Sequence, residues 1–241
     1  MSQAEGTRLF DRRLFLAAAI VFPLIVLAGF GRTYYLMRLF DVPPLASMVV
    51  HAHGLLMTSW VALFATQVWF ISSRRVRLHQ QLGYGGIGLA ALIIAVGFVT
   101  ALRAAKYGSA STPPGIDPHA FMIVPIFDLL MFVVLFGGAV YYRKRPAEHK
   151  RLMLLTAINF LPPAIARIPL ASLQAFGPLW FFGLPAFLAL LCLGLDTRRY
   201  ARVNRVFAAG TGLLLASYVV RLAIMMSAPW LDVARWLTSF V

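Results

Sequence analysis

Five histidines are the residues of this chain most able to do chemistry: His51, His53, His79, His119 and His149. Each lies near one end of a long apolar run. If these runs cross a membrane, the histidines of four consecutive runs lie alternately near its outer and its inner surface. In a bundle of four helices this alternation would place two histidines on facing helices near each end. Facing histidines of this kind hold a haem b, with one imidazole on each axial face of the iron.

The local sequences around two of the histidines repeat. His79 and His149 lie seventy residues apart, and each ends an R-x-x-x-H pattern that starts at Arg75 or Arg145. A repeated helix hairpin would explain this spacing. His51 and His53 point about 200° apart on a helix, so only one of them can face a given partner. The alternative interpretation is that His79 and His149 merely anchor helix ends in basic loops.

Three further ionisable residues lie inside apolar runs, where charge is costly and tends to be paired or functional. Arg167 and Arg221 are about 22 Å from one edge of a core about 30 Å thick, and Asp128 is about 13 Å from the other edge. His51 and His53 are about 9–12 Å from that second edge. The five side chains are therefore predicted to share one layer.

Two arginines against one aspartate leave one positive charge in this layer, which favours an anion such as a haem propionate, a lipid phosphate or a small acidic substrate. The alternative is an Asp–Arg pair that fastens helices, with the second arginine reaching outward. A zinc or copper site made by His51 or His53 with His119 and Asp128 is a further possibility.

The amino-acid composition indicates that these side chains belong to a membrane protein. Of 241 residues, 61% are apolar and 12% are charged, and the mean hydropathy is +0.80. A soluble domain carries about 25% charged residues, so we expect a polytopic membrane protein. The net charge of +14 comes from short loops rather than from a nucleic-acid-binding surface. No hydrolase, kinase or cysteine-based metal motif is present.

Apolar runs of spanning length predict an all-α fold of seven transmembrane helices in a single membrane domain, 1–241, with spans 2–5 as a four-helix core. The predicted spans are residues 14–30, 45–72, 84–105, 119–142, 152–174, 178–196 and 206–228.

The connections between these spans alternate in charge. Residues 1–13, 73–83, 143–151 and 197–205 hold fifteen of the twenty-two Lys and Arg residues. Because cytoplasmic loops are rich in cations, the N-terminus is predicted in the cytoplasm and the C-terminus outside.

Two resemblances add to this interpretation. The first rests on His53-Gly54, Gln67, Arg74, Leu78-His79, Gly83, His149, Met153 and Arg167. These residues resemble a family of predicted bacterial membrane proteins of unknown function across spans 2 to 5. This resemblance implies a bacterial inner (plasma) membrane protein and no particular activity.

The alternating histidines also resemble the transmembrane di-haem cytochrome b family related to the ascorbate-dependent ferric reductases. That resemblance implies one or two haem b groups and electron transfer from a cytoplasmic donor to an outer acceptor. By resemblance, His53 with His119 would hold an outer haem and His79 with His149 an inner one. The implied propionate partners are Arg167 and Arg221 outside and Arg75, Arg77 and Arg151 inside.

The leading hypothesis is therefore a haem-b-type electron-transfer protein that moves electrons across the bilayer. Two rival functions remain open at this point. One is a cofactor-free accessory subunit that docks against other membrane subunits, and the other is a carrier or sensor for an anion bound by the arginine layer.

Overall fold

The structure, a computed structural model, describes residues 3–40, 42, 47–109 and 111–241, and these residues contain helices and no strand. The predicted all-α class is therefore confirmed. The helices are α1 (Gln3–Phe30), α2 (Met48–Ser72), α3 (Val76–Tyr107), α4 (Pro118–Phe121), α5 (Ile123–Tyr141), α6 (Pro146–Asn159), α7 (Pro162–Arg167), α8 (Ala171–Gln174), α9 (Pro178–Phe181), α10 (Gly183–Tyr200), α11 (Arg205–Ile224) and α12 (Ala228–Thr238). A π-helical turn, Gly31–Tyr35, and a 3-10 turn, Met37–Leu39, follow α1.

Within the described residues, six helical segments are long and apolar enough to cross a membrane, which indicates a multi-pass membrane protein. Each corresponds to one predicted span, although residues 45 and 46 at the start of the second span lie outside the described part of the chain. The six segments are Leu9–Tyr35, Met48–Ser72, Val76–Tyr107, Pro118–Tyr141, Pro178–Tyr200 and Arg205–Ile224.

The fifth predicted span, residues 152–174, is not one helix but is divided among α6, α7 and α8. The cause is Pro162-Pro163, because a proline has no N–H to donate to the carbonyl four residues earlier. The carbonyl of Ile158 instead accepts from the backbone N–H of Leu161 at 3.1 Å. Most of the second half of α6 is buried, so other helices surround the break, as irregular backbone in a membrane requires.

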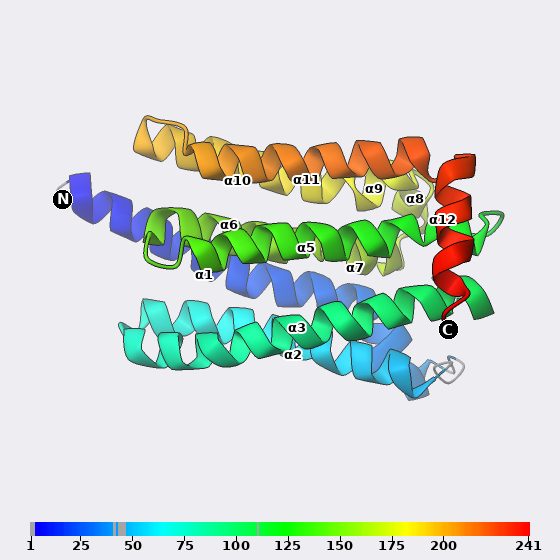
Figure 1. Ribbon diagram of the computed structural model, residues 1–241. Helices are drawn as coiled ribbons and strands as arrows, with labels where there is room; N and C mark the ends of the chain where they lie inside the picture. The colour runs from blue at the N-terminus through cyan, green and yellow to red at the C-terminus, as the bar shows by residue number, and fades with distance from the viewer. Residues whose placement is uncertain (1–2, 41, 43–46, 110) are drawn as a thin grey trace.

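The long helices lie side by side along one direction (Figure 1), and the contacts between them close into a ring. In sequence order, α1 packs on α2, α2 on α3, α3 on α5 and α5 on α6, and α1 also contacts α6 and α7 to close the ring. α10 and α11 cover α5 and α6 from outside. The core is thus not spans 2–5 alone, because α1 supplies the wall that the four predicted helices lack.

A glycine allows α1 to reach the broken helix. A Cβ added at Gly29 would overlap the backbone carbonyl of Ala164 in α7, so the two backbones are in direct contact here. Phe22 and Val26 of α1 are buried against Ala164 and Ile165. The close approach is what lets a helix near the N-terminus join the core.

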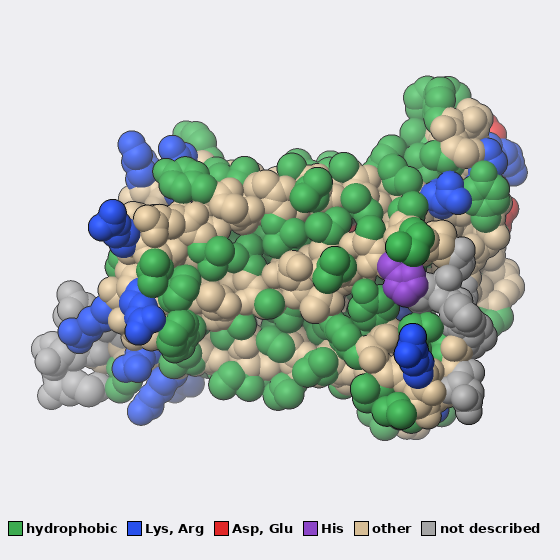
Figure 2. All heavy atoms as spheres, turned by 90° about the horizontal axis from the view of Figure 1, so that it is seen from below, with side chains coloured by type: hydrophobic (Ala, Val, Ile, Leu, Met, Phe, Trp, Pro, Cys, Tyr) green, Lys and Arg blue, Asp and Glu red, His purple; other side chains and the backbone are tan. Residues whose placement is uncertain are grey.

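The two ends of the bundle differ in character. The connections α2–α3, α5–α6 and α10–α11 and the N-terminus lie together at one end, which we call the basic end (Figure 1). Figure 2 shows Lys and Arg side chains at the two ends of the visible face and none in the apolar band between them. At the opposite end, α12 runs across the bundle instead of along it (Figure 1).

Candidate ligand site at the basic end of the bundle

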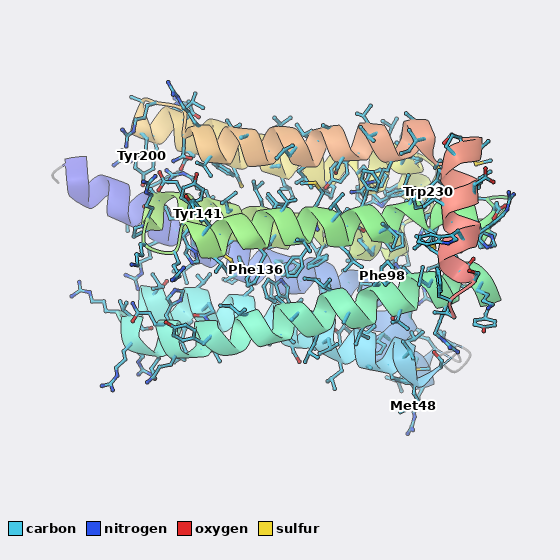
Figure 3. The ribbon with its side chains drawn as sticks, viewed as in Figure 1. Met48, Phe98, Phe136, Tyr141, Tyr200 and Trp230 are labelled. Carbon is cyan, nitrogen blue, oxygen red and sulfur yellow. The ribbon has the colours of Figure 1, made fainter. Side chains whose placement is uncertain are left out.

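A cavity of about 1220 Å³ lies at the basic end, inside the ring of α1, α2, α3, α5 and α6. Its inner wall is apolar and aromatic, with Trp60 and Phe64 from α2, Phe136 from α5 and Met153 from α6. Ordinary ligand pockets are about 300–1,000 Å³, so this space is large enough for a bulky ligand. Figure 3 shows Phe136 pointing from α5 into the interior between the helix layers.

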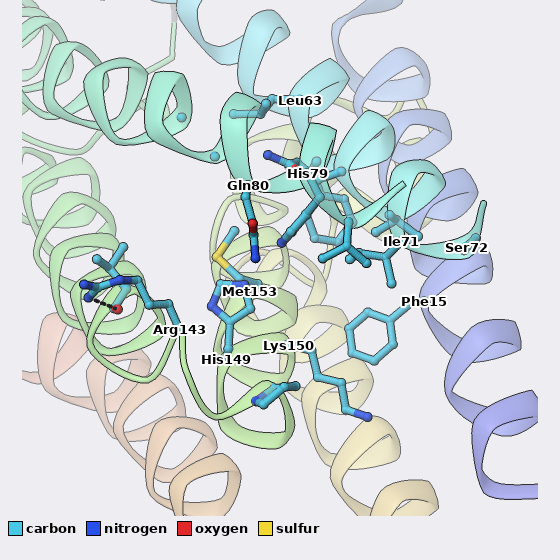
Figure 4. Close-up of a pocket in the computed structure, with 18 of the residues that line it drawn as sticks. Phe15, Leu63, Ile71, Ser72, His79, Gln80, Arg143, His149, Lys150 and Met153 are labelled. Atoms are coloured by element: carbon cyan, nitrogen blue, oxygen red, sulfur yellow. Dashed lines mark hydrogen bonds between the residues drawn. The ribbon is translucent and has the colours of Figure 1, made fainter. Parts of the chain in front are cut away.

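Two of the five histidines lie close together in the wall of this cavity. His79 enters from the first turn of α3 and His149 from the first turn of α6, and their ring centroids lie 6.2 Å apart with the planes at 80°. Figure 4 shows His79 and Gln80 reaching in from α3 and His149 and Met153 from α6. The structure therefore brings together the predicted inner pair.

The local structure fixes the imidazole of His149. Pro146 starts α6 and places His149 one turn further along, where its Nδ1 donates to the carbonyl of Ala139 at 2.8 Å. This bond puts the proton on Nδ1 and leaves Nε2 with a free lone pair. His79 lies beside the backbone carbonyl of Gln67, and its Nδ1 is buried with no hydrogen-bond partner among the described residues. A carbonyl partner of the kind that Ala139 gives His149 orients imidazoles that ligate metals.

Four buried polar atoms that belong to residues of the cavity wall have no partner in the described part of the chain. They are Asp11 Oδ1, Trp60 Nε1, Gln67 Oε1 and His79 Nδ1. A buried donor or acceptor left unpaired costs about 1–3 kcal/mol. Four such atoms around one space indicate that the space accommodates water or a polar guest.

The cavity rim is cationic. Arg12, Arg74, Arg143 and Lys144 line it and are exposed, whereas the acidic residue on the rim, Asp11, is 2.5 Å from Lys150 Nζ. The Tyr200 hydroxyl also donates to Asp11 at 2.8 Å. Asp11 is thus neutralised by its own lysine, and the rim keeps a positive excess that suits an anionic group.

The three arginines that the resemblance implies as inner propionate partners, Arg75, Arg77 and Arg151, do not line the cavity. Arg151 forms a buried pair with Asp196, with Nη2 at 2.7 Å from Oδ1, so its charge is already compensated. Arg75 lies over the ring of Trp69. Of the rim cations, the sequence analysis named only Arg74, as part of the first resemblance, although all four belong to the basic segments that it identified.

His53 and His119, the predicted outer pair, each have their own set of neighbouring residues. His119 follows the α4 N-cap, Asp117, whose carboxylate accepts from the His119 backbone N–H at 2.7 Å. This bond holds the pKa of Asp117 below its ordinary value. The His119 ring lies 3.3 Å from Asp117 through Nδ1 and 3.3 Å from Thr238 of α12 through Nε2. Both nitrogens of His119 therefore have partners.

His53 lies instead within electrostatic range of Arg167, and its Nδ1 is buried without a partner among the described residues. Arg167 donates from Nη1 to the carbonyl of Pro163 at 2.7 Å and from Nη2 to the Ser111 hydroxyl, and it lies over the ring of Phe30. His51 is exposed and lies near Tyr34.

Arg221 is paired inside the bundle. Its Nη1 is 2.6 Å from Oδ1 of Asp128, and it also donates to the backbone oxygen and hydroxyl of Ser217 at 3.1 Å each. The pair joins α11 to α5, which is the fastening arrangement considered above. Asn159, just before the break in α6, donates to the backbone oxygen of Asp128 at 2.9 Å.

In the residues that the structure describes, no group of three or more His, Cys, Asp or Glu side chains is arranged to hold a metal ion. This includes the combination of His51 or His53 with His119 and Asp128 that was considered as a zinc or copper site.

Comparison of the chain with models of known protein families, with curated proteins and with solved structures finds no match.

Proposed function

We propose that this protein is a membrane electron-transfer protein that binds one haem b in the cavity at the basic end, between His79 and His149. The observation that carries the proposal is the separation of these two rings. Metal–imidazole bonds of about 2 Å on opposite sides of one ion place the two ring centroids about 6 Å apart, and the observed separation is 6.2 Å. Haem needs just two axial ligands from the protein, and this cavity offers a pair.

The remaining features of the cavity support the same ligand. Haem is a flat apolar plate with two carboxylates on one edge. The wall of Trp60, Phe64, Phe136 and Met153 suits the plate, and the cationic rim suits the carboxylates. The His149 bond to Ala139 leaves Nε2 as the free lone pair, which fits axial ligation.

A haem held between two imidazoles supplies one-electron transfer when bound. The chain's contribution is to hold both axial positions, to exclude water with the aromatic wall and to place the carboxylate edge at the basic rim. By the positive-inside rule the basic end faces the cytoplasm, so a cytoplasmic donor is the expected partner. Transfer across the whole bilayer would need a second site at the opposite end. His53 and His119 remain the proposed ligands there, and His119 would have to give up its contact with Thr238 to bind the metal.

The test is a reduced-minus-oxidised visible spectrum of the protein purified from haem-replete cells, with a pyridine haemochrome assay for stoichiometry. We expect one haem b per chain. His79→Ala and His149→Ala should each lose haem or convert its six-coordinate spectrum to a high-spin one, and added imidazole should restore the original spectrum. His51→Ala is the matched control, because this imidazole is exposed at the opposite end.

A colourless protein, or two alanine variants that keep the full low-spin spectrum, would refute the proposal. Two haems per chain would support a second site, and the His53→Ala and His119→Ala variants should then each retain only the haem at the basic end.

A further inference from the structure

The helix that crosses the opposite end, α12, has three distinct sides. Ala234 is fully buried and Thr238 is 5% exposed, and together with Trp230 they form the side that packs against the bundle. A second side carries Val233 and Trp236, continued by Phe240 in the turn that follows α12. Trp236 and Phe240 are 61% and 67% exposed.

The third side of α12 is polar. Asp232, Arg235 and Ser239 follow one another at the same three- and four-residue spacing as the exposed apolar set, so they lie on the other flank of the helix. Arg235 and Asp232 pair with each other at 3.4 Å and are both exposed. The helix is therefore divided into a bundle-facing side, an open apolar flank and an open polar flank.

The bundle fixes the depth of α12. Its buried side contacts Ala101, Leu102 and Ala105 of α3, and α3 ends at Tyr107. At 1.5 Å per residue these contacts lie about 3–9 Å inside the end of the spanning helix. α12 therefore packs on the flank of the last turns of α3 and not on the loops beyond them.

Hydrogen bonds hold α12 in this position. Trp230 Nε1 donates to the backbone oxygens of His119 and Ala120 at 3.1 and 3.3 Å, and Figure 3 shows Trp230 at the junction of α12 with the bundle. Thr238 lies 3.3 Å from His119 Nε2. The orientation of the two open flanks is thus set by bonds near both ends of the helix.

We propose that α12 is a membrane-interface helix: its Val233–Trp236–Phe240 flank inserts between lipid headgroups, and its Asp232–Arg235–Ser239 flank faces water. Interfacial helices bury their apolar side about 5–10 Å into the boundary between headgroups and acyl chains, which agrees with the depth set by α3. Tryptophan is also the residue most typical of that boundary. The proposal is independent of any haem and requires only that the bundle spans a bilayer.

The experiment uses single nitroxide labels on the full chain in a Cys192→Ala background, reconstituted into vesicles of phosphatidylethanolamine and phosphatidylglycerol. Trp236→Cys and Phe240→Cys report the apolar flank, and Arg235→Cys and Ser239→Cys are matched controls one residue away. Collision rates are measured with oxygen, which partitions into lipid, and with a neutral nickel chelate, which stays in water.

We expect oxygen to relax the labels at 236 and 240 several-fold more than nickel does, and the order to reverse at 235 and 239. Equal nickel access on both flanks would show that α12 lies in water and would overturn the proposal. Immobilised labels at 236 and 240, shielded from both reagents, would also overturn it, because a protein surface such as a second copy of the chain would then cover the flank.

Discussion

Removing the carboxylate of Asp128 should strongly destabilise the fold. Arg221 is 0% exposed and Asp128 is 5% exposed, so the charges compensate each other out of contact with water. In Asp128→Leu the guanidinium keeps its bonds to Ser217 but loses the carboxylate 2.6 Å away. Because arginine stays protonated in proteins, the variant retains a buried, uncompensated charge.

The expected cost is about 3–5 kcal/mol, as for other buried pairs that lose one partner. For a chain of this size each kcal/mol shifts Tm by about 2–4 °C, so Tm should fall by about 6–20 °C. Asp128→Asn should fall between wild type and Asp128→Leu, because an amide oxygen still accepts from the guanidinium. The double variant Arg221→Met/Asp128→Leu should recover most of the loss, since replacing a whole buried pair by apolar residues is close to neutral.

The assay is thermal unfolding in detergent, followed by size-exclusion elution after heating, with haem content measured on the folded fraction. The fastening role predicts unchanged haem content per folded chain in the double variant. A single variant as stable as wild type would refute the reasoning, and so would a double variant no more stable than Asp128→Leu. Loss of haem from a stably folded double variant would instead assign Arg221 to the cofactor, as the resemblance implied.

Three further predictions follow from individual contacts. Gly29→Ala should lower Tm because its methyl group would overlap the α7 backbone, whereas Gly137→Ala in α5, with open space around its Cβ, should leave Tm unchanged or raise it slightly; equal Tm values in thermal melts would argue against the close crossing. Asp196→Asn, which unpairs a buried arginine of α6, should reduce Tm by several degrees without changing haem content per folded chain, and a selective loss of haem would assign that arginine to the ligand. Arg143→Gln/Lys144→Gln should weaken haemin binding to the apoprotein at low salt, and the difference should shrink at 1 M salt; titration by absorbance measures both, and unchanged affinity at low salt would mean that these rim cations do not contact the ligand.

The sequence alone predicted a large part of the fold. Apolar run length is a local property, because any stretch of about twenty apolar residues can cross a bilayer as a helix. Six of the predicted spans therefore correspond to helices of spanning length. The fifth failed as a single helix for a reason that is also local: Pro162-Pro163 interrupts the backbone hydrogen bonds and separates α6 from α7.

The candidate site was only half predictable. Periodicity and the R-x-x-x-H repeat singled out His79 and His149, and the structure brings the two rings within 6.2 Å. Nothing in the local sequence indicated that α1 would close the cavity or that Arg12 and Arg74 would stand on its rim. Those facts depend on which helices are neighbours.

For the charged residues inside the apolar runs, the sequence predicted their depth but not their pairing. The sequence placed Asp128, Arg167 and Arg221 at one depth, because depth follows from the rise of 1.5 Å per residue. It left open which arginine would meet the aspartate, since pairing depends on how helices rotate and pack. The structure pairs Arg221 with Asp128 and directs Arg167 toward Ser111. Composition and apolar run length thus determined which segments are long and apolar enough to cross a membrane, whereas long-range packing decided which side chains meet.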